Sequence, residues 1–130
     1  MPKKILLIDD EELITRTLAN ALEKHGYEVW VAKKGDDALV MTEEEDFDLI
    51  ISDIRMPGMN GVETVKKILE GLKLRGAEKI PAIFITGYAD HETEIKARAL
   101  NPHAYIHKPF DFPHFINQVK GALEKSGATR

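Results

Sequence analysis

The sequence predicts an α/β protein in which five helices cover both faces of a parallel sheet of five strands. Three observations support this fold class. Short apolar runs alternate with longer amphipathic segments along the whole chain. Most of the apolar runs are continuous, which is typical of parallel strands that are buried on both faces. Acidic or other polar residues follow several of these runs, at the edge where open α/β sheets bind their ligands.

The predicted strands are short runs rich in β-branched and aliphatic residues, bounded by residues that favour turns. The first run, Ile-Leu-Leu-Ile, begins at residue 5. Pro81 marks the start of the fourth strand and Gly87 marks its end, because both residue types interrupt regular structure. We expect strands at residues 5–8, 27–32, 49–53, 82–86 and 104–107.

The segments between these strands carry apolar residues at helical spacing. In the first segment Ile14, Leu18 and Leu22 fall on one stripe, and Gly26 provides a stop signal. The fourth segment has few apolar positions, so we expect its helix to pack more weakly than the first. We expect helices at 11–24, from 35 to the acidic run 43–45, from 62 to before Gly76, at 90–100, and from about 113 to 125.

Composition limits the class of protein. The chain has 130 residues, no cysteine and a formal net charge of −4. Disulfide and thiolate chemistry are therefore excluded, and the acidic balance argues against a nucleic-acid surface. No apolar stretch approaches the roughly 20 residues that a membrane helix needs. We expect a cytoplasmic protein with one domain over residues 1–125, a patternless tail over 126–130 and no output domain.

Carboxylates follow two of the predicted strands. The first strand leads into Asp9, Asp10 and two glutamates, and the third strand ends on Asp53. If the two strands are neighbours, three carboxylates meet at one edge of the sheet. Two unit charges roughly 4 Å apart repel each other by about 4 kcal/mol at an effective dielectric constant near 20. A bound cation relieves this repulsion, and carboxylate oxygens are ligands for Mg²⁺. The pattern therefore predicts a magnesium site.

Each residue at this edge also has a purely structural interpretation. Asp9 and Asp10 stand before a predicted helix, where acids interact favourably with the helix dipole. Asp53 could end a strand in a turn. Thr86 is a β-branched strand residue, and Lys108 could be a solvated surface lysine. We favour a functional site because all five side chains are predicted to lie at the same edge of one sheet.

Four motifs carry a resemblance to a known family. They are Ile-Leu-Leu-Ile-Asp-Asp over residues 5–10, Asp-Leu-Ile-Ile-Ser-Asp-Ile-Arg-Met-Pro-Gly-Met-Asn-Gly over 48–61, Ile-Thr-Gly-Tyr-Ala over 85–89, and Lys-Pro-Phe over 108–110. In this order and spacing the chain resembles the receiver domains of two-component response regulators over residues 4–125. The resemblance implies a flavodoxin-like, doubly wound sheet with strand order 2-1-3-4-5. It also implies a phosphoacceptor signalling protein that is not an enzyme.

The resemblance implies a role for each residue at the predicted edge. Asp53 would accept a phosphoryl group on its carboxylate. The implied ligands of Mg²⁺, or of Mn²⁺ as an alternative, are Asp9, Asp10, Asp53 and the backbone carbonyl of Arg55. The implied phosphoryl-binding residues are Thr86, Gly87 and Lys108.

Further implied features concern switching and access. Thr86 and Tyr105 would form the switch that changes the surface of the fourth helix, fifth strand and fifth helix, although Tyr105 could simply be a half-buried strand tyrosine. The Lys108–Pro109 peptide bond is expected to be cis. Arg55 and Tyr88 lie two residues after Asp53 and Thr86. We hypothesise that they shield the phosphoryl group from water.

The phosphodonor implied by the resemblance is a sensor histidine kinase or a histidine phosphotransfer protein, and the downstream protein is not identified. The regulator is expected to be a monomer or a phosphorylation-dependent dimer, without direct nucleic-acid binding or membrane insertion. The sequence leaves open whether it stands alone or belongs to a longer regulator.

Three other functions fit the sequence less well. A haloacid-dehalogenase-like phosphohydrolase would need a second acid where Arg55 stands, and no cap domain is apparent. A receiver-like module that is never phosphorylated is disfavoured because all five site residues are present. A flavin-binding reading lacks a Ser- and Thr-rich phosphate loop after the first strand.

Overall fold

A computed structural model describes residues 2–87 and 90–128 of the chain, and for residues 125–128 it describes the backbone only. The strands within these residues are β1 (Lys4–Ile8), β2 (Glu28–Ala32), β3 (Leu49–Asp53), β4 (Ala82–Thr86) and β5 (Ala104–His107). The helices are α1 (Glu12–Lys24), α2 (Gly35–Glu44), α3 (Gly61–Leu74), α4 (His91–Arg98) and α5 (Phe112–Ala128).

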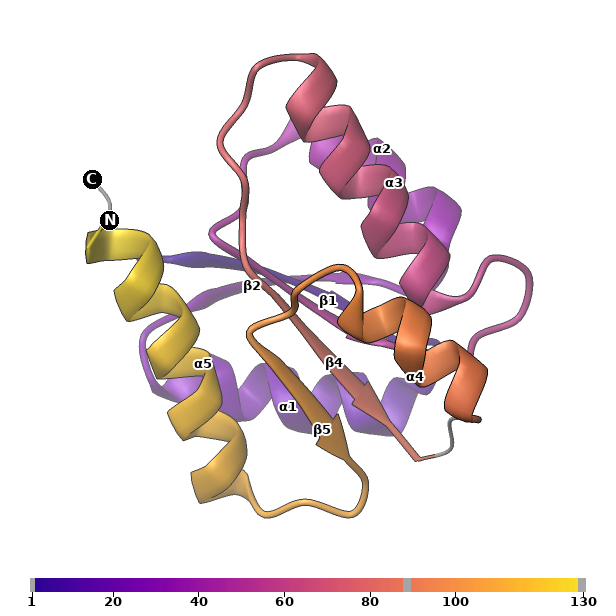
Figure 1. The fold of residues 1–130 in the computed structure, drawn as a ribbon. Coiled ribbons are helices and arrows are strands. Elements are labelled where there is room, and N and C mark those ends of the chain that lie inside the picture. Colours follow the sequence, from indigo (N-terminus) through magenta and orange to yellow (C-terminus); the bar gives the residue numbers. More distant parts are fainter. Residues whose placement is uncertain (1, 88–89, 129–130) are drawn as a thin grey trace.

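The strands form one parallel sheet in the order β2-β1-β3-β4-β5. The predicted fold class and strand order are both confirmed. Helices α1 and α5 cover one face of the sheet, and α2, α3 and α4 lie on the other (Figure 1). Because every strand runs the same way, the carboxyl ends of β1, β3, β4 and β5 reach the same edge of the sheet.

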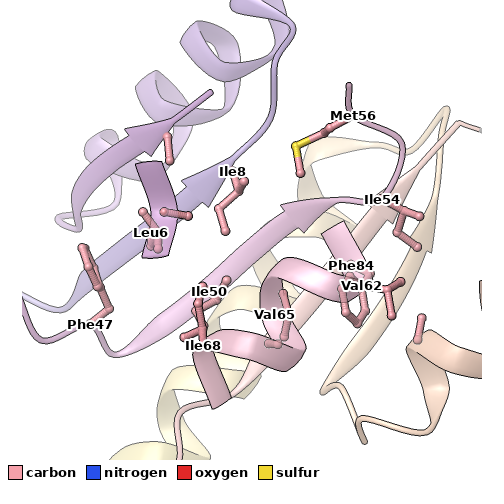
Figure 2. Packing of buried hydrophobic residues seen from close by; sticks show 14 of the residues in the cluster. Leu6, Ile8, Phe47, Ile50, Ile54, Met56, Val62, Val65, Ile68 and Phe84 are labelled. Atoms are coloured by element: carbon pink, nitrogen blue, oxygen red, sulfur yellow. The ribbon is translucent and has the colours of Figure 1, made fainter. Parts of the chain in front are cut away.

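Alternate residues along each strand supply two separate cores. Leu6, Ile8 and Ile50 face the side of α2, α3 and α4, and Figure 2 shows Ile50 near Val65 and Ile68 of α3. The intervening strand residues pack against α1 and α5; these are Ile5, Leu7, Leu49, Ile51, Ile83, Ile85 and Ile106. Both faces are thus sealed by aliphatic side chains, which explains why the strands read as continuous apolar runs.

Helices α1 and α3 end in turns of the same type. The φ angle of Gly26 after α1 is 88°, and that of Gly76 after α3 is 71°. The N–H of Tyr27 donates to the carbonyl of Leu22, and the N–H of Ala77 donates to that of Leu72. These bonds close Schellman motifs, which need a residue with positive φ. Tyr27 is therefore part of the α1 turn, and β2 begins one residue later than predicted.

Helices α4 and α5 differ from prediction. Helix α4 ends at Arg98 instead of residue 100, since Asn101 adopts a φ of 55° and closes the turn. Only Ala97 of this helix is buried, in agreement with the expected weak packing. Helix α5 continues to Ala128, beyond its predicted end near residue 125 and into the segment expected to be a tail, because extending an existing helix requires no new nucleus.

None of the helices in the described ranges combines the length and the apolar character needed to cross a bilayer.

Gly61 and Gly71 of α3 test how tightly this helix is fixed to β3. A Cβ atom on Gly61 would overlap the backbone carbonyl oxygen of Asp53, whereas one on Gly71 would meet nothing within 4 Å. We expect Gly61→Ala to lower the free energy of unfolding by about 3 kcal/mol. Gly71→Ala should raise it by about 0.5–1 kcal/mol through helix propensity. Urea unfolding of both variants checks this, and equal effects would contradict the close approach.

Candidate functional site

The parallel sheet brings the sequence-predicted site residues to one edge. Asp9 follows β1 directly, and Asp53 and Thr86 are the last residues of β3 and β4. Lys108 follows β5. The register pairs Ile8 of β1 with Ser52, so that Asp9 and Asp53 extend from adjacent strands at the same level. Residues up to about 100 positions apart in the sequence are thus gathered by strand pairing.

Three carboxylates form the centre of this edge. Asp9, Asp10 and Asp53 each offer an oxygen, and these three atoms all lie within 4.8 Å of one another. Asp9 is fully buried and Asp53 is 4% exposed, while Asp10 is exposed to solvent. Two acids are therefore held in a poorly hydrated position, and the third lies at the surface. This arrangement can hold a hard cation between carboxylate oxygens.

The surroundings of Asp53 disfavour its negative charge. Burial, followed by the charge of Asp9, raises the pKa of Asp53 from its ordinary 3.8 to about 6. The nearby Lys108 ammonium and the N–H of Ile54, which donates to Oδ1 at 2.9 Å, act in the opposite direction. The hydroxyl of Ser52 donates to the backbone carbonyl of Asp53 at 2.8 Å and fixes the strand end. The carboxylate is thus positioned firmly and left short of positive charge.

Asp9 has one satisfied and one unsatisfied oxygen. Its Oδ1 accepts a hydrogen bond of 3.0 Å from the N–H of Glu11. Its Oδ2 is buried and has no hydrogen-bond partner within the described residues, although the Nζ of Lys108 lies 3.8 Å away. Burial raises the pKa of Asp9. A buried carboxylate oxygen without a donor is where a cation would bind favourably, so the donor set fits a divalent metal ion.

Lys108 places an ammonium group beside this cluster. Its Nζ lies 3.8 Å from Asp9, 3.7 Å from Glu11 and 3.9 Å from Asp53, and its side chain is 18% exposed. The Lys108–Pro109 peptide bond is cis. One ammonium group thus faces several carboxylates, which leaves the site with a surplus of negative charge.

Glu11 was missed as a site residue. The sequence explains it fully as an acid near a helix N-terminus, and only the structure shows its carboxylate beside Lys108. The N–H of Ile54 was also missed, because a backbone donor leaves no signal in a sequence.

The other expected site residues are less closely defined. Thr86 is buried with 1% exposure at the end of β4. A Cβ atom on Gly87 would make only ordinary contacts, at 3.6 and 3.8 Å, with the side chain of Lys108. Space alone therefore does not require glycine at this position. Arg55 is exposed in the loop after β3, and Tyr88 lies outside the described residues.

Tyr105 on β5 contacts two other rings and a guanidinium group. Its ring centroid lies 6.4 Å from that of Phe84 and 5.2 Å from that of His107. The guanidinium carbon of Arg98 lies 4.9 Å from the ring centroid, and Glu94 holds Arg98 by an ion pair of 2.8 Å. The tyrosine hydroxyl is buried without a hydrogen-bond partner in the part of the chain that is described. Burial raises its pKa.

Comparisons with known proteins agree with this arrangement. The family model described as the response regulator receiver domain matches residues 5–120. The polar-differentiation response regulator DivK of Brucella anthropi is 34% identical over 123 residues, which cover 95% of this chain and 98% of that protein.

Solved structures are also similar. A CheY-like response regulator receiver domain protein from Methanospirillum hungatei matches with a TM-score of 0.89 and 32% identity over the whole of both chains. Chemotaxis protein CheY4 of Vibrio cholerae matches with a TM-score of 0.83 and 28% identity over 95% of this chain and all of that one.

Because the pKa of Asp53 is raised, its negative charge should lower the free energy of unfolding by an amount that depends on pH. This lowering is absent below the ordinary pKa of 3.8, grows as the pH rises, and is complete above about 6. With a chelator present, Asp53→Asn should therefore gain about 2–3 kcal/mol of unfolding free energy relative to the parent between about pH 4 and pH 7.5. Urea unfolding at both pH values measures this. A difference between the two proteins that does not change with pH would contradict the prediction.

Proposed function

Because this chain belongs to the response regulator receiver domain family, we propose that it is a switch whose signal is phosphorylation of Asp53. The observation that carries the proposal is the position of Asp53. Its carboxylate lies at the carboxyl edge of the sheet, between two further aspartates and the Lys108 ammonium. A nucleophile for phosphoryl transfer needs a fixed oxygen and nearby positive charge for the incoming phosphoryl oxygens, and this site supplies both.

The proposed reaction transfers a phosphoryl group from a histidine to an aspartate. A carboxylate oxygen of Asp53 attacks phosphorus, and the bond between phosphorus and the donor imidazole nitrogen breaks. That nitrogen leaves with the electron pair, and Asp53 becomes an acyl phosphate. The donor is a sensor histidine kinase or a histidine phosphotransfer protein. The chain therefore catalyses only its own modification, and we do not class it as an enzyme.

Asp9, Asp10 and Asp53, with the backbone carbonyl of Arg55, are proposed to hold Mg²⁺, or Mn²⁺ in its place. The support comes from the close carboxylate oxygens and from the unsatisfied Oδ2 of Asp9. When bound, the ion supplies positive charge that offsets the repulsion between the carboxylates and the phosphoryl oxygens.

Lys108 and Thr86 are proposed to bind the remaining phosphoryl oxygens. The ammonium of Lys108 already lies 3.9 Å from Asp53 Oδ1 and can donate to an oxygen attached there. Thr86 ends the strand next to β3, and its hydroxyl would donate to another oxygen, with Gly87 beside it. Whether Arg55 and Tyr88 shield the acyl phosphate from water stays a prediction.

Switching is proposed to pass from Thr86 to Tyr105. Movement of Thr86 toward the phosphoryl group would free space beside Phe84 and the Tyr105 ring. The buried hydroxyl of Tyr105 has no hydrogen-bond partner among the described residues, which disfavours its present position by about 1–3 kcal/mol. Its rearrangement would change the surface of α4, β5 and α5, where we place the downstream protein. We also propose a cytoplasmic protein that does not bind nucleic acid directly, as a monomer or a phosphorylation-dependent dimer.

Covalent labelling tests the phosphoacceptor. Incubation with acetyl phosphate and Mg²⁺ should add one phosphoryl group to the parent and none to Asp53→Asn, measured by intact-protein mass spectrometry. Asp46→Asn removes an exposed carboxylate away from the site and should be labelled like the parent. Equal labelling of Asp53→Asn would mean that another residue is the acceptor.

Thermal unfolding tests the metal site. A ligand that binds only the folded state, at a concentration 100 times its dissociation constant, adds about 2.7 kcal/mol of stability. Millimolar MgCl₂ should therefore raise the melting temperature of the parent above its value in NaCl of the same ionic strength. Asp10→Asn should lose most of this increase, whereas Asp36→Asn, an exposed acid on α2, should keep it. A parent that does not respond to Mg²⁺ would rule out the proposed site.

A further inference from the structure

A hollow lies away from the carboxylates, between the C-terminal ends of α3 and α4. Its volume is about 620 Å³. Its floor is apolar and consists of buried or half-buried side chains, namely Leu69, Leu72, Ala77 and Leu100. We call this hollow the α3–α4 groove. One wall is the end of α3 with the loop after it, and the other is the turn formed by residues 99–101 after α4. Both segments lead into strands, β4 and β5, so the groove lies at the sheet edge opposite to Asp53.

The rim of the groove is positively charged. Lys66, Lys73 and Lys79 are exposed around it, and Glu70 is the one acid among the residues that line it. The residues that line the groove thus carry two more positive than negative charges, although the whole chain has a net charge of −4. Local positive potential on an acidic protein attracts acidic partners and orients them.

The backbone at the groove is already hydrogen-bonded. The carbonyls of Leu72 and Lys73 accept from Ala77 and Gly76 at the end of α3. At the end of α4, the carbonyls of Ala97 and Arg98 accept from Leu100 and Asn101 in the same way. The polar recognition that the groove offers therefore comes mainly from the three lysine ammonium groups, which donate hydrogen bonds and accept none.

Apolar surface continues outside the groove. Leu74 is 88% exposed and follows Glu70 by one helical turn, while Ile95 is 56% exposed and precedes Ala99 by one turn. Residues four apart are neighbours on a helix surface, so Leu74 lies beside Glu70 of the rim and Ile95 lies beside Ala99. A small molecule confined to the groove would not cover them, whereas a peptide segment several turns long would.

We propose that the α3–α4 groove is a docking site for an acidic, amphipathic helix of a partner protein. Apolar residues of that helix, spaced i, i+3, i+4 and i+7, fill the floor and cover Leu74 and Ile95. Its flanking carboxylates pair with Lys66, Lys73 and Lys79. This surface adjoins α4 of the proposed switch surface, but its lining residues on that side, 99–101, follow the helix, and it is available before any phosphorylation.

A peptide titration tests the docking site in the unphosphorylated protein. The probe is a synthetic helix of about four turns with leucine at the apolar positions and glutamate beside them, and the control peptide carries lysine in place of glutamate. In ¹⁵N-labelled full-length protein, the acidic peptide should shift the amide signals of Leu69, Leu72, Ala77 and Leu100. The basic peptide should leave them unchanged.

Charge variants sharpen the test. The double variant Lys73→Glu/Lys79→Glu should bind the acidic peptide roughly fivefold to tenfold more weakly. The matched pair Lys24→Glu/Lys120→Glu makes the same charge change on α1 and α5, across the sheet, and should bind like the parent. Ala99→Asp, an exposed position in the groove wall, should abolish the shifts without touching the phosphoacceptor site.

Three results would overturn the proposal. They are equal binding of the acidic and basic peptides, signal shifts located elsewhere on the protein, and equal weakening by both lysine pairs. Labelling of Asp53 by acetyl phosphate in the groove variants should match the parent, so the two sites can fail independently.

Discussion

Two buried carboxylates at one edge of the sheet place an electrostatic constraint on this structure. Asp9 and Asp53 are both removed from water and close to each other, and burial is the main reason why their pKa values are raised. Lys108 and the backbone donors of Glu11 and Ile54 compensate only in part. An edge with this charge would gain stability from a bound cation, and under the proposed function its charge balance would change again on phosphorylation. The buried charges of Asp9 and Asp53 therefore both lower the stability of the unphosphorylated protein and provide the basis of the proposed chemistry.

The rest of the fold keeps these charges in place. Two aliphatic cores clamp β1 and β3 from both faces, and the helix start at Gly61 lies directly against the carbonyl of Asp53. The free energy of unfolding of native proteins is only about 5–15 kcal/mol. A well-packed scaffold is therefore needed to tolerate buried charges that lower it by a few kcal/mol. The strands that lead to the acids are accordingly almost fully buried, whereas Ala97 is the one buried residue of α4.

Much of the fold could be predicted because buried parallel strands leave a clear trace. The runs ending at Ile8, Asp53 and Thr86 are apolar, short and bounded by breakers, and the structure ends the strands at those residues. Helix ends were less predictable, since α4 stops where Asn101 takes a positive φ and α5 continues through Gly127. Neither choice depends on apolar periodicity.

The parts of the site that escaped prediction depend on three-dimensional contacts. Glu11 beside Lys108 and Arg98 over Tyr105 each join segments that no local pattern connects. The α3–α4 groove likewise arises where two helix ends, about 25 residues apart in the chain, come together. Patterns of residue type predicted which side chains reach the carboxyl edge of the sheet, but only the packing of complete elements shows which of them touch.

The uneven anchoring of α4 has a consequence for motion. A helix with a single buried side chain can detach locally at a small fraction of the cost of global unfolding, and its amide protons then exchange with solvent early. On the proposed function, a few new hydrogen bonds to a phosphoryl group would each contribute about 1 kcal/mol, which is comparable with such a local cost. A rigid sheet bordered by one loosely held helix would thus concentrate the response at α4 and its neighbours β5 and α5, while the remainder of the molecule keeps its shape.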